Sequence, residues 1–133
     1  MNSSLSPTSY RRGQVWLVDF GNPMGSEFGM EHPAVIVSHR SLLNTAQIIG
    51  HLIVVPGTST RFERNGELLV SHQEVQHTPA NGLDHTTYFM AEHVRSLSVR
   101  RLRRLAGQME LAFLKQLDDR LCLVLDLFQP GSS

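Results

Sequence analysis

A chain of 133 residues with 41% hydrophobic and 18% charged side chains has the composition of one ordinary globular domain. This composition excludes disorder of the whole chain, and a formal net charge of zero excludes a global field that would attract nucleic acid. The single cysteine, Cys122, excludes an internal disulfide, and no run of about 18 apolar residues could span a membrane. We therefore expect a soluble protein of the cytoplasm.

The first half of the chain alternates strand-like runs with polar segments. Apolar, β-branched or aromatic runs predict strands at Gln14–Phe20, Pro33–Ser38 and His51–Pro56. A polar loop with three glycines, Gly21–Glu31, is expected between the first two strands. One helical turn is expected at Arg40–Asn44, and Gly57–Thr60 is expected to form a polar turn that leaves the third strand.

Weaker patterns predict further strands in the second half, at Glu67–Ser71, His85–Ala91 and Leu102–Gly107. The segment His72–Asp84 carries Pro79 and Asn81-Gly82, so we expect it to be mostly loop. Ser98 is expected to cap a short turn that runs through Arg101.

The C-terminal segment has the spacing of a helix that Pro130-Gly131 would stop. Every residue over 121–125 is apolar, which indicates burial on more than one side, either in a homodimer interface or in a groove of the protein's own barrel. Together the elements predict a mainly β fold, a small curved sheet or barrel with a C-terminal helix. We expect a single domain over 11–129, between a disordered tail over 1–10 and a short tail over 130–133.

The residues that could carry chemistry do not suggest a metal or a cofactor. Seven histidines are spread singly along the chain, without an HxH, HExxH or CxxC pattern, and no phosphate-binding glycine motif is present. Cys122 lies in an apolar run, where a thiol is a poor nucleophile. The remaining His, Glu, Thr and Arg side chains suit cleavage of RNA through its own 2′-hydroxyl, which needs an acid, a base and donors to the phosphate.

The first loop and the end of the third strand supply the candidate groups. His32 could act as acid or base, because an imidazole ordinarily titrates near pH 6.5. Glu27 or Glu31 could orient it, and Thr58 or Ser59 could donate a hydrogen bond to a phosphate oxygen. The simpler alternative is a half-exposed loop histidine without a function.

Six segments follow one another along the chain: Gly13–Phe20, Gly25-Ser26-Glu27, Pro33–Ser38, Asn44, Val54–Ser59 and Ala91–Leu97. In this order they resemble the MazF/PemK (Kid) toxin family. The resemblance covers roughly residues 12–128 and includes the closing strand and helix. It implies an SH3-like barrel of the CcdB/PemK-like fold with a C-terminal helix, and a homodimer. It also implies that the first loop gates an RNA-binding groove.

In function, the resemblance implies the toxin of a type II toxin–antitoxin system. Such a toxin is a metal-independent, sequence-specific endoribonuclease that cuts single-stranded mRNA and leaves a 2′,3′-cyclic phosphate and a 5′-hydroxyl. Its partner would be a small, partly disordered antitoxin of the MazE/PemI type that blocks the groove. Two alternatives remain open: a gyrase poison like the related CcdB toxins, or a silenced domain that only binds RNA or antitoxin.

One position departs from the family pattern. The family's catalytic arginine directly precedes the proline of the second strand, where this chain has His32, whereas Thr58 matches the usual companion residue. Three outcomes are open: His32 does acid–base work while Arg61 or Arg40 stabilises charge, cleavage is slow, or cleavage is lost and binding is kept. The expected RNA contacts are Ser26, Phe28, Glu31, Ser59, Arg61 and Arg95, with Phe28 as a stacking candidate.

Overall fold

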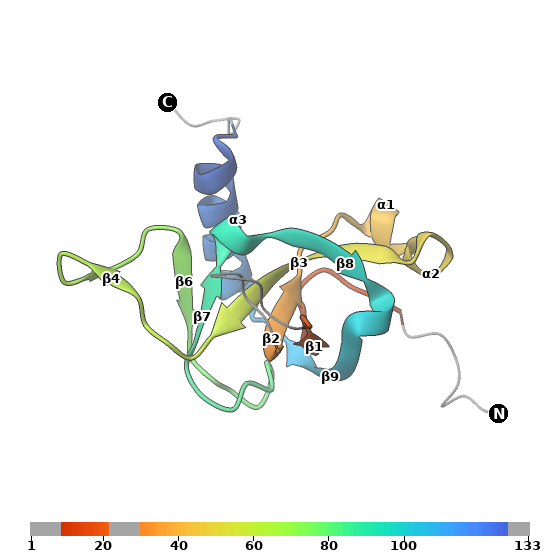
Figure 1. The fold of residues 1–133 in the computed structure, drawn as a ribbon, viewed down its shortest axis with the longest axis horizontal. Coiled ribbons are helices and arrows are strands. Elements are labelled where there is room, and N and C mark those ends of the chain that lie inside the picture. The colour runs from red at the N-terminus through yellow and green to blue at the C-terminus, as the bar shows by residue number, and fades with distance from the viewer. Residues whose placement is uncertain (1–8, 22–29, 128–133) are drawn as a thin grey trace.

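The apolar runs of the sequence pair into one antiparallel sheet, which a C-terminal helix covers on one side (Figure 1). The structure, a computed structural model, describes residues 9–21 and 30–127. The strands are β1 (Gln14–Asp19), β2 (Glu31–Ile36), β3 (His51–Thr58), β4 (Glu63–Arg64), β5 (Glu67–Leu68), β6 (His72–Val75), β7 (Thr87–Met90), β8 (Arg95–Ser98) and β9 (Leu102–Gln108). The helices are α1 (Arg40–Leu43), α2 (Ala46–Ile49) and α3 (Leu111–Leu125), with short 3₁₀ turns η2 (Ala91–His93) and η3 (Val99–Arg101).

Strand β3 is the centre of the sheet, whose order is β6-β7-β3-β2-β1-β9. One edge of β3 pairs with β2, from Ala34↔Pro56 to Ile36↔Val54. The other edge is shared: its first half pairs with β8 and its last two residues pair with β7. The sheet therefore divides at β3 into a barrel-like part and a smaller part that carries β6 and β7.

Strand β2 begins and ends two residues earlier than the sequence predicts and strand β3 ends two residues later, and both added segments contain candidate site residues. Strand β2 begins at Glu31, because Glu31 and His32 pair with the end of β1. Strand β3 continues through Thr58, which pairs with Tyr88, so the expectation of a turn over Gly57–Thr60 is wrong for its first two residues. In both places pairing with a distant segment overrides the local polar composition.

The middle of the chain differs most from the sequence-based expectation. The predicted strand Glu67–Ser71 shrinks to β5, which pairs with β4 around an Asn65-Gly66 turn in a hairpin that projects from the sheet (Figure 1). Strand β6 lies inside the segment expected to be loop, because His72 and Val75 are buried against β7. Helix α2 has no counterpart in the prediction, whereas the Ser98-capped turn and the strand at Leu102 are confirmed.

The two faces of the sheet pack two separate cores. The barrel core lies inside the curved part and contains Trp16, Val18, Phe20, Ala34, Ile36, Leu52, Val54 and Leu97. The helix-side core lies between the sheet and α3 and contains Val15, Val35, Val55, Val75, Phe89, Met109, Leu114 and Leu117. Residues of one strand alternate between these cores, as the two-residue period of a strand requires.

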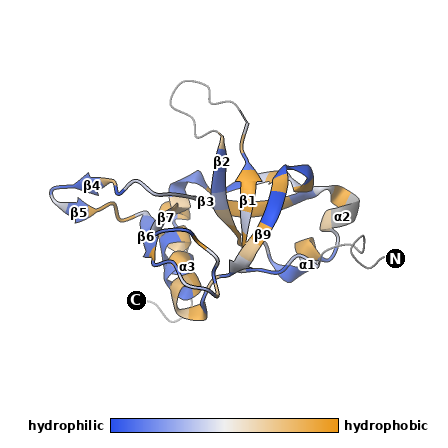
Figure 2. Cartoon of the chain, turned by 90° about the horizontal axis from the view of Figure 1, so that it is seen from below, coloured by the Kyte–Doolittle hydropathy of each residue, from blue (hydrophilic) through white to orange (hydrophobic). Residues whose placement is uncertain are grey.

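Helix α3 buries Leu114 and Leu117 and ends at Leu125, followed by Asp126 in the left-handed conformation of a C-cap. Its end therefore comes earlier than expected, and Pro130-Gly131 lie outside the described residues. Leu123 and Leu125 are 57% and 50% exposed, so the alternative that a groove of the protein's own barrel buries this segment is wrong. Figure 2 shows apolar residues along this helix, and Cys122 is half-buried rather than buried.

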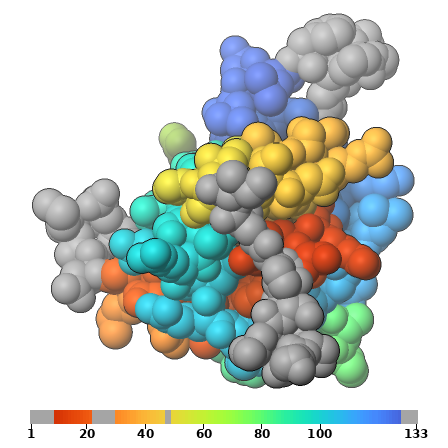
Figure 3. All heavy atoms as spheres, turned by 90° about the vertical axis from the view of Figure 1, so that its right-hand side faces the viewer, coloured from red at the N-terminus to blue at the C-terminus, as the bar shows by residue number. Residues whose placement is uncertain are grey.

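The short helices α1 and α2 close the end of the molecule opposite the β4–β5 hairpin (Figure 1). Figure 3 shows α1 and α2 lying between α3 and the β8–η3 segment. His39 caps α1 by accepting a hydrogen bond from the backbone N–H of Ser41, and Leu43 packs into the barrel core. Tyr10, at the start of the described chain, lies 6.1 Å from Trp16 between ring centroids. No helix among the described residues is long and apolar enough to cross a membrane.

Candidate active site

His32 lies at the end of the barrel that faces the first loop. On β2 it is directly opposite Val18, and it shares a strand face with Ala34 and Ile36, which belong to the barrel core. Its ring lies 6.4 Å from the ring of Phe20 between centroids. Since Phe20 is the last core residue of this end, His32 lies at the rim of the barrel core.

Arg95 reaches the same rim from another strand. It is the first residue of β8 and shares a face with Leu97, which is buried in the barrel core. Its guanidinium carbon lies 5.5 Å from the centre of the Phe20 ring, within the range of a cation–π contact. The imidazole of His32 and the guanidinium of Arg95 thus both contact the buried ring of Phe20. We call Phe20, His32 and Arg95 the rim cluster.

Thr58 is on the same face of the sheet. A side chain built at the preceding Gly57 would meet Thr87 and Phe89, which belong to the opposite face. Thr58 is only 8% exposed, and its hydroxyl oxygen accepts a hydrogen bond from the backbone N–H of Thr60 at 3.2 Å. A hydroxyl that accepts this bond still has its own hydrogen to donate.

The ladder between β2 and β3 indicates how His32 and Thr58 are related. It ends at the pair Ala34↔Pro56, and each of the two candidates lies two residues beyond that pair on its own strand. The antiparallel register therefore brings His32 and Thr58 to the same end of neighbouring strands. This placement is compatible with the expectation that His32 and Thr58 belong to one site.

A row of polar side chains continues from Thr58 across the smaller part of the sheet. Thr58 pairs with Tyr88, which in turn pairs with Glu74, so all three side chains share one face. Arg61 lies over the Tyr88 ring at 6.0 Å and forms ion pairs with Glu63 at 2.6 Å and Glu74 at 3.1 Å. The hydrogen bond to Glu63, followed by the one to Tyr88, raises the pKa of Arg61 above its ordinary value.

The other candidates from the first loop and its flanks are placed differently. Ser26, Glu27 and Phe28 lie outside the described residues. Glu31 is exposed and, as the neighbour of His32 on a strand, points to the opposite face. Ser59 is exposed directly after β3. The structure thus brings His32 and Arg95 to the Phe20 ring, places Thr58 at the corresponding end of the strand next to His32, and does not add Glu31 to them.

The arginines between 95 and 104 do not form one shared positively charged surface. Asp19, at the end of β1, accepts a hydrogen bond from Arg103 at 3.0 Å, and Arg101 donates to the Asp19 backbone carbonyl at 3.2 Å. A backbone hydrogen bond from Gly21, together with Arg103, lowers the pKa of Asp19. Two of these arginines therefore hold the exit of β1, where the first loop begins.

A second histidine, His72, is not among the candidates that the sequence indicated. His72 is 2% exposed, its Nε2 lies 2.8 Å from a carboxylate oxygen of Glu92, and its Nδ1 is buried without a hydrogen-bond partner among the described residues. The edge of its ring contacts Phe62. Partial burial raises the pKa of Glu92, but hydrogen bonds from His72 and neighbouring groups outweigh burial and lower it overall. In the sequence His72 lies in a polar segment, so only the knowledge that this histidine is buried could have indicated its pairing with Glu92.

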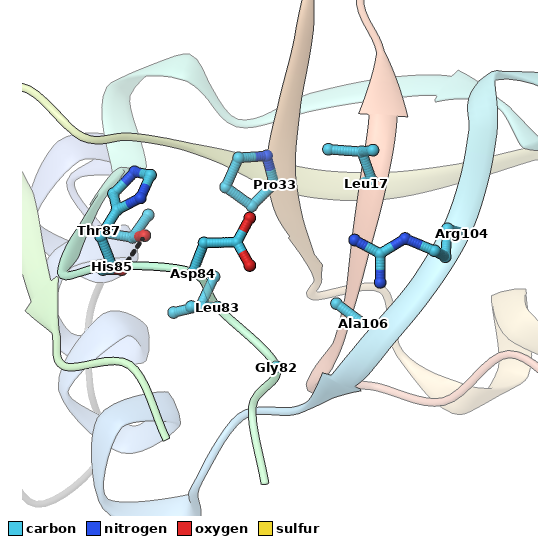
Figure 4. Close-up of a pocket in the computed structure, with 9 residues that line it drawn as sticks. All are labelled: Leu17, Pro33, Gly82, Leu83, Asp84, His85, Thr87, Arg104 and Ala106. Carbon is cyan, nitrogen blue, oxygen red and sulfur yellow. Dashed lines mark hydrogen bonds between the residues drawn. The ribbon is translucent and has the colours of Figure 1, made fainter. Parts of the chain in front are cut away.

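A shallow pocket opens on the other face of β1 and β2 (Figure 4). Leu17 and Pro33 line it, and Asp84 and Arg104 point toward one another from its two sides. Because Pro33 follows His32 directly on β2, the two side chains lie on opposite faces of the strand. This pocket is therefore separate from the rim cluster.

The arrangement at the rim suits a negatively charged substrate. An imidazole can exchange a proton, a hydroxyl can donate one hydrogen bond, and a guanidinium keeps its charge at every physiological pH. Phosphate groups are bound by this combination of donors. Among the residues that the structure describes, no group of three His, Cys, Asp or Glu side chains could hold a metal ion.

Comparison with known proteins assigns the chain to a family. Residues 11–125 match the family described as PemK-like, MazF-like toxin of type II toxin–antitoxin system. The chain belongs to this toxin family. The chain is also 37% identical over 120 residues to the endoribonuclease MazF9 of Mycobacterium tuberculosis (strain ATCC 25618 / H37Rv), covering 89% of this chain and 98% of that protein.

Solved structures show the fold of the PemK/MazF family. A MazF from Deinococcus radiodurans has a TM-score of 0.70 at 20% identity and covers 90% of this chain and 99% of its own. An endoribonuclease from a mycobacterial species in complex with its cognate antitoxin has a TM-score of 0.66 at 22% identity and covers 93% and 100%. The expected mainly β fold with a C-terminal helix is therefore confirmed.

Proposed function

We propose that this PemK/MazF-family toxin is a metal-independent endoribonuclease that cleaves single-stranded mRNA in the cytoplasm at the rim of its barrel. The observation that carries the proposal is that His32 and Arg95 contact one ring, Phe20, while Thr58 lies at the corresponding end of the strand next to His32. The family match and the name of the mycobacterial relative support the same class of reaction. These comparisons name MazF toxins and endoribonucleases, so cleavage of RNA is favoured over poisoning of gyrase.

The proposed reaction is transfer of the phosphate within the RNA. The 2′-oxygen forms a bond to phosphorus while the bond to the 5′-oxygen of the next nucleotide breaks, which leaves a 2′,3′-cyclic phosphate and a 5′-hydroxyl. The attacking hydroxyl must lose a proton and the leaving oxygen must gain one. His32 exchanges one of these protons, and the Thr58 hydroxyl donates a hydrogen bond to a non-bridging phosphate oxygen.

The proposed assembly is a homodimer regulated by an antitoxin. Exposed leucines on α3, namely Leu111, Leu123 and Leu125, support burial of this helix against a second copy. A MazE-type antitoxin is the expected partner, because the structural neighbours include MazE–MazF complexes from Deinococcus radiodurans.

The test uses the purified full chain, single-stranded RNA of mixed sequence and an excess of EDTA. We expect cuts at a short recurring sequence, with a cyclic phosphate on one product and a 5′-hydroxyl on the other. An RNA with a single 2′-deoxy nucleotide at the cut position should resist cleavage, because it lacks the attacking oxygen. Absence of cleavage, or loss of cleavage in EDTA, would contradict the proposal.

A further inference from the structure

The proposed reaction needs a fixed positive charge that neither His32 nor Thr58 supplies. As the 2′-oxygen attacks, negative charge develops on the non-bridging oxygens of the phosphate. The hydroxyl of Thr58 is neutral, and an imidazole that transfers a proton is neutral during part of the reaction. An arginine at the rim of the barrel core would keep its charge throughout.

Arg61 is near Thr58, but its charge is already balanced. Its guanidinium forms ion pairs with both Glu63 and Glu74 and also lies over the Tyr88 ring. To reach a phosphate, Arg61 would have to break at least one of these pairs. Its arrangement is that of a residue that holds the segment after β3 against the sheet.

The other described arginines near the ends of β1 and β2 are also unsuited. Arg40 begins α1, beyond the end of β2 that is remote from His32. Arg101 and Arg103 are engaged with Asp19. Arg104 lines the pocket on the opposite face of the sheet.

Arg95 meets the requirement. It is exposed, and among the described residues no carboxylate lies within ion-pair distance of its guanidinium. Its contact with the Phe20 ring fixes its position without neutralising its charge or using its N–H donors. The same ring contacts His32, so the fixed charge and the proton-transfer group are positioned by one buried side chain.

We propose that Arg95 is a catalytic residue whose guanidinium donates to the non-bridging oxygens of the phosphate under attack. This assignment rests on the proposed ribonuclease function and refines it, because it separates charge stabilisation by Arg95 from proton transfer by His32. It differs from a role in tracking the RNA backbone, which would affect binding alone.

The experiment compares Arg95→Gln with Arg100→Gln in the full chain. Both changes remove one positive charge from an exposed arginine, but Arg100 lies in η3, beyond the end of β8 that is remote from Arg95. Two quantities are measured: the single-turnover cleavage rate at saturating RNA, and the Kd for an RNA with a 2′-deoxy nucleotide at the cut position.

For Arg95→Gln we expect the saturated rate to fall about 100-fold, as for removal of one charge-stabilising donor, with less than about a threefold change in Kd. Arg95→Lys keeps the charge without the fork and should recover part of the rate. Arg100→Gln should cleave at the wild-type rate. Thermal unfolding of each variant confirms that the fold is kept.

Two results would overturn the assignment: an unchanged saturated rate for Arg95→Gln, or a defect confined to Kd. Either result, with an active wild-type chain, would leave the proposed ribonuclease function standing. A wild-type chain that does not cleave RNA would overturn the function and the assignment together.

Discussion

The guanidinium of Arg95 and the ring of Phe20 are in contact across the barrel, with 5.5 Å between the guanidinium carbon and the ring centre. The two residues are 75 positions apart in the chain, and they meet because β8 pairs with β3 and closes the barrel beside the end of β1. The same ring contacts His32. A residue without any reactive group therefore contacts two residues that have one, and we expect it to position both.

Replacing Phe20 with leucine tests this role. Leucine fills most of the buried volume but removes the flat ring, so we expect a loss of stability of about 1 kcal/mol and a cleavage rate at saturating RNA about tenfold lower. Phe20→Tyr keeps the ring and should cleave at close to the wild-type rate. Equal rates for the leucine variant and wild type would show that the ring does not position the site.

Thr58 is expected to act through its hydroxyl alone. Thr58→Val keeps the shape of this buried side chain and removes the donor, and we expect kcat to fall about 100-fold. Thr58→Ser keeps the donor and should retain most of the activity. Steady-state kinetics on a defined RNA measure both variants, and a fully active valine variant would exclude Thr58 from catalysis.

Asn81 is expected to be important for stability and not for chemistry. It is completely buried, and its amide donates to the Gln76 carbonyl at 2.9 Å and to Glu110 at 3.0 Å. Its side-chain oxygen accepts from the backbone N–H groups of Thr78 and Leu83. These bonds tie the loop before β7 to the start of α3.

We expect Asn81→Ala to lower the free energy of unfolding by about 3 kcal/mol, because several buried polar groups lose their partner. The exposed Asn44 offers a matched control, and Asn44→Ala should change stability by less than about 0.5 kcal/mol. Urea unfolding measures both. A loss below about 1 kcal/mol for Asn81→Ala would contradict the structural role.

Glu110 should make stability depend on pH. Partial burial raises the pKa of Glu110, but hydrogen bonds from Thr78, its own backbone and Asn81 outweigh burial, so the pKa lies below its ordinary value of 4.5. The unfolded chain then takes up this proton at a higher pH than the folded chain. The contribution of Glu110 is present above about pH 4.5 and is lost as pH falls through the folded pKa.

Glu110→Gln removes this titration, so the stability difference between wild type and variant should be largest above pH 5 and should shrink as the pH is lowered toward 3. Urea unfolding at several pH values measures the difference and cancels the parallel effects of Asp19 and Glu92. A difference that stays constant from pH 6 to pH 3 would contradict the lowered pKa.

The strands that the sequence predicts well are those with an almost continuous apolar pattern. The runs that begin at Gln14 and Ala34 form β1 and the buried part of β2, because both faces of these strands lie in a core. Strand β6 could not be predicted in this way. It buries His72 and Gln73 beside Val75, so its polar residues resemble those of a loop.

Prediction of the site from the sequence has the same limit. The chemistry of its side chain selected His32 and the family resemblance supported Thr58, and the two residues lie on neighbouring strands. The role of Phe20 was not predictable, because in sequence it is simply the last apolar residue of a strand. The resemblance gave Arg95 as an RNA contact, but its contact with Phe20 was not predictable, nor was the engagement of Arg101 and Arg103 with Asp19.

The most direct test of the account is the cleavage rate of His32→Ala at saturating RNA in EDTA, measured beside His51→Ala. His51 is an exposed histidine at the start of β3, remote from the rim, and its replacement controls for the loss of an imidazole. We expect His32→Ala to lose at least about 100-fold in rate, as for removal of a general acid or base, and His51→Ala to cleave like wild type. A His32→Ala protein that cleaves at the wild-type rate would contradict the central claim that this imidazole transfers a proton in the reaction.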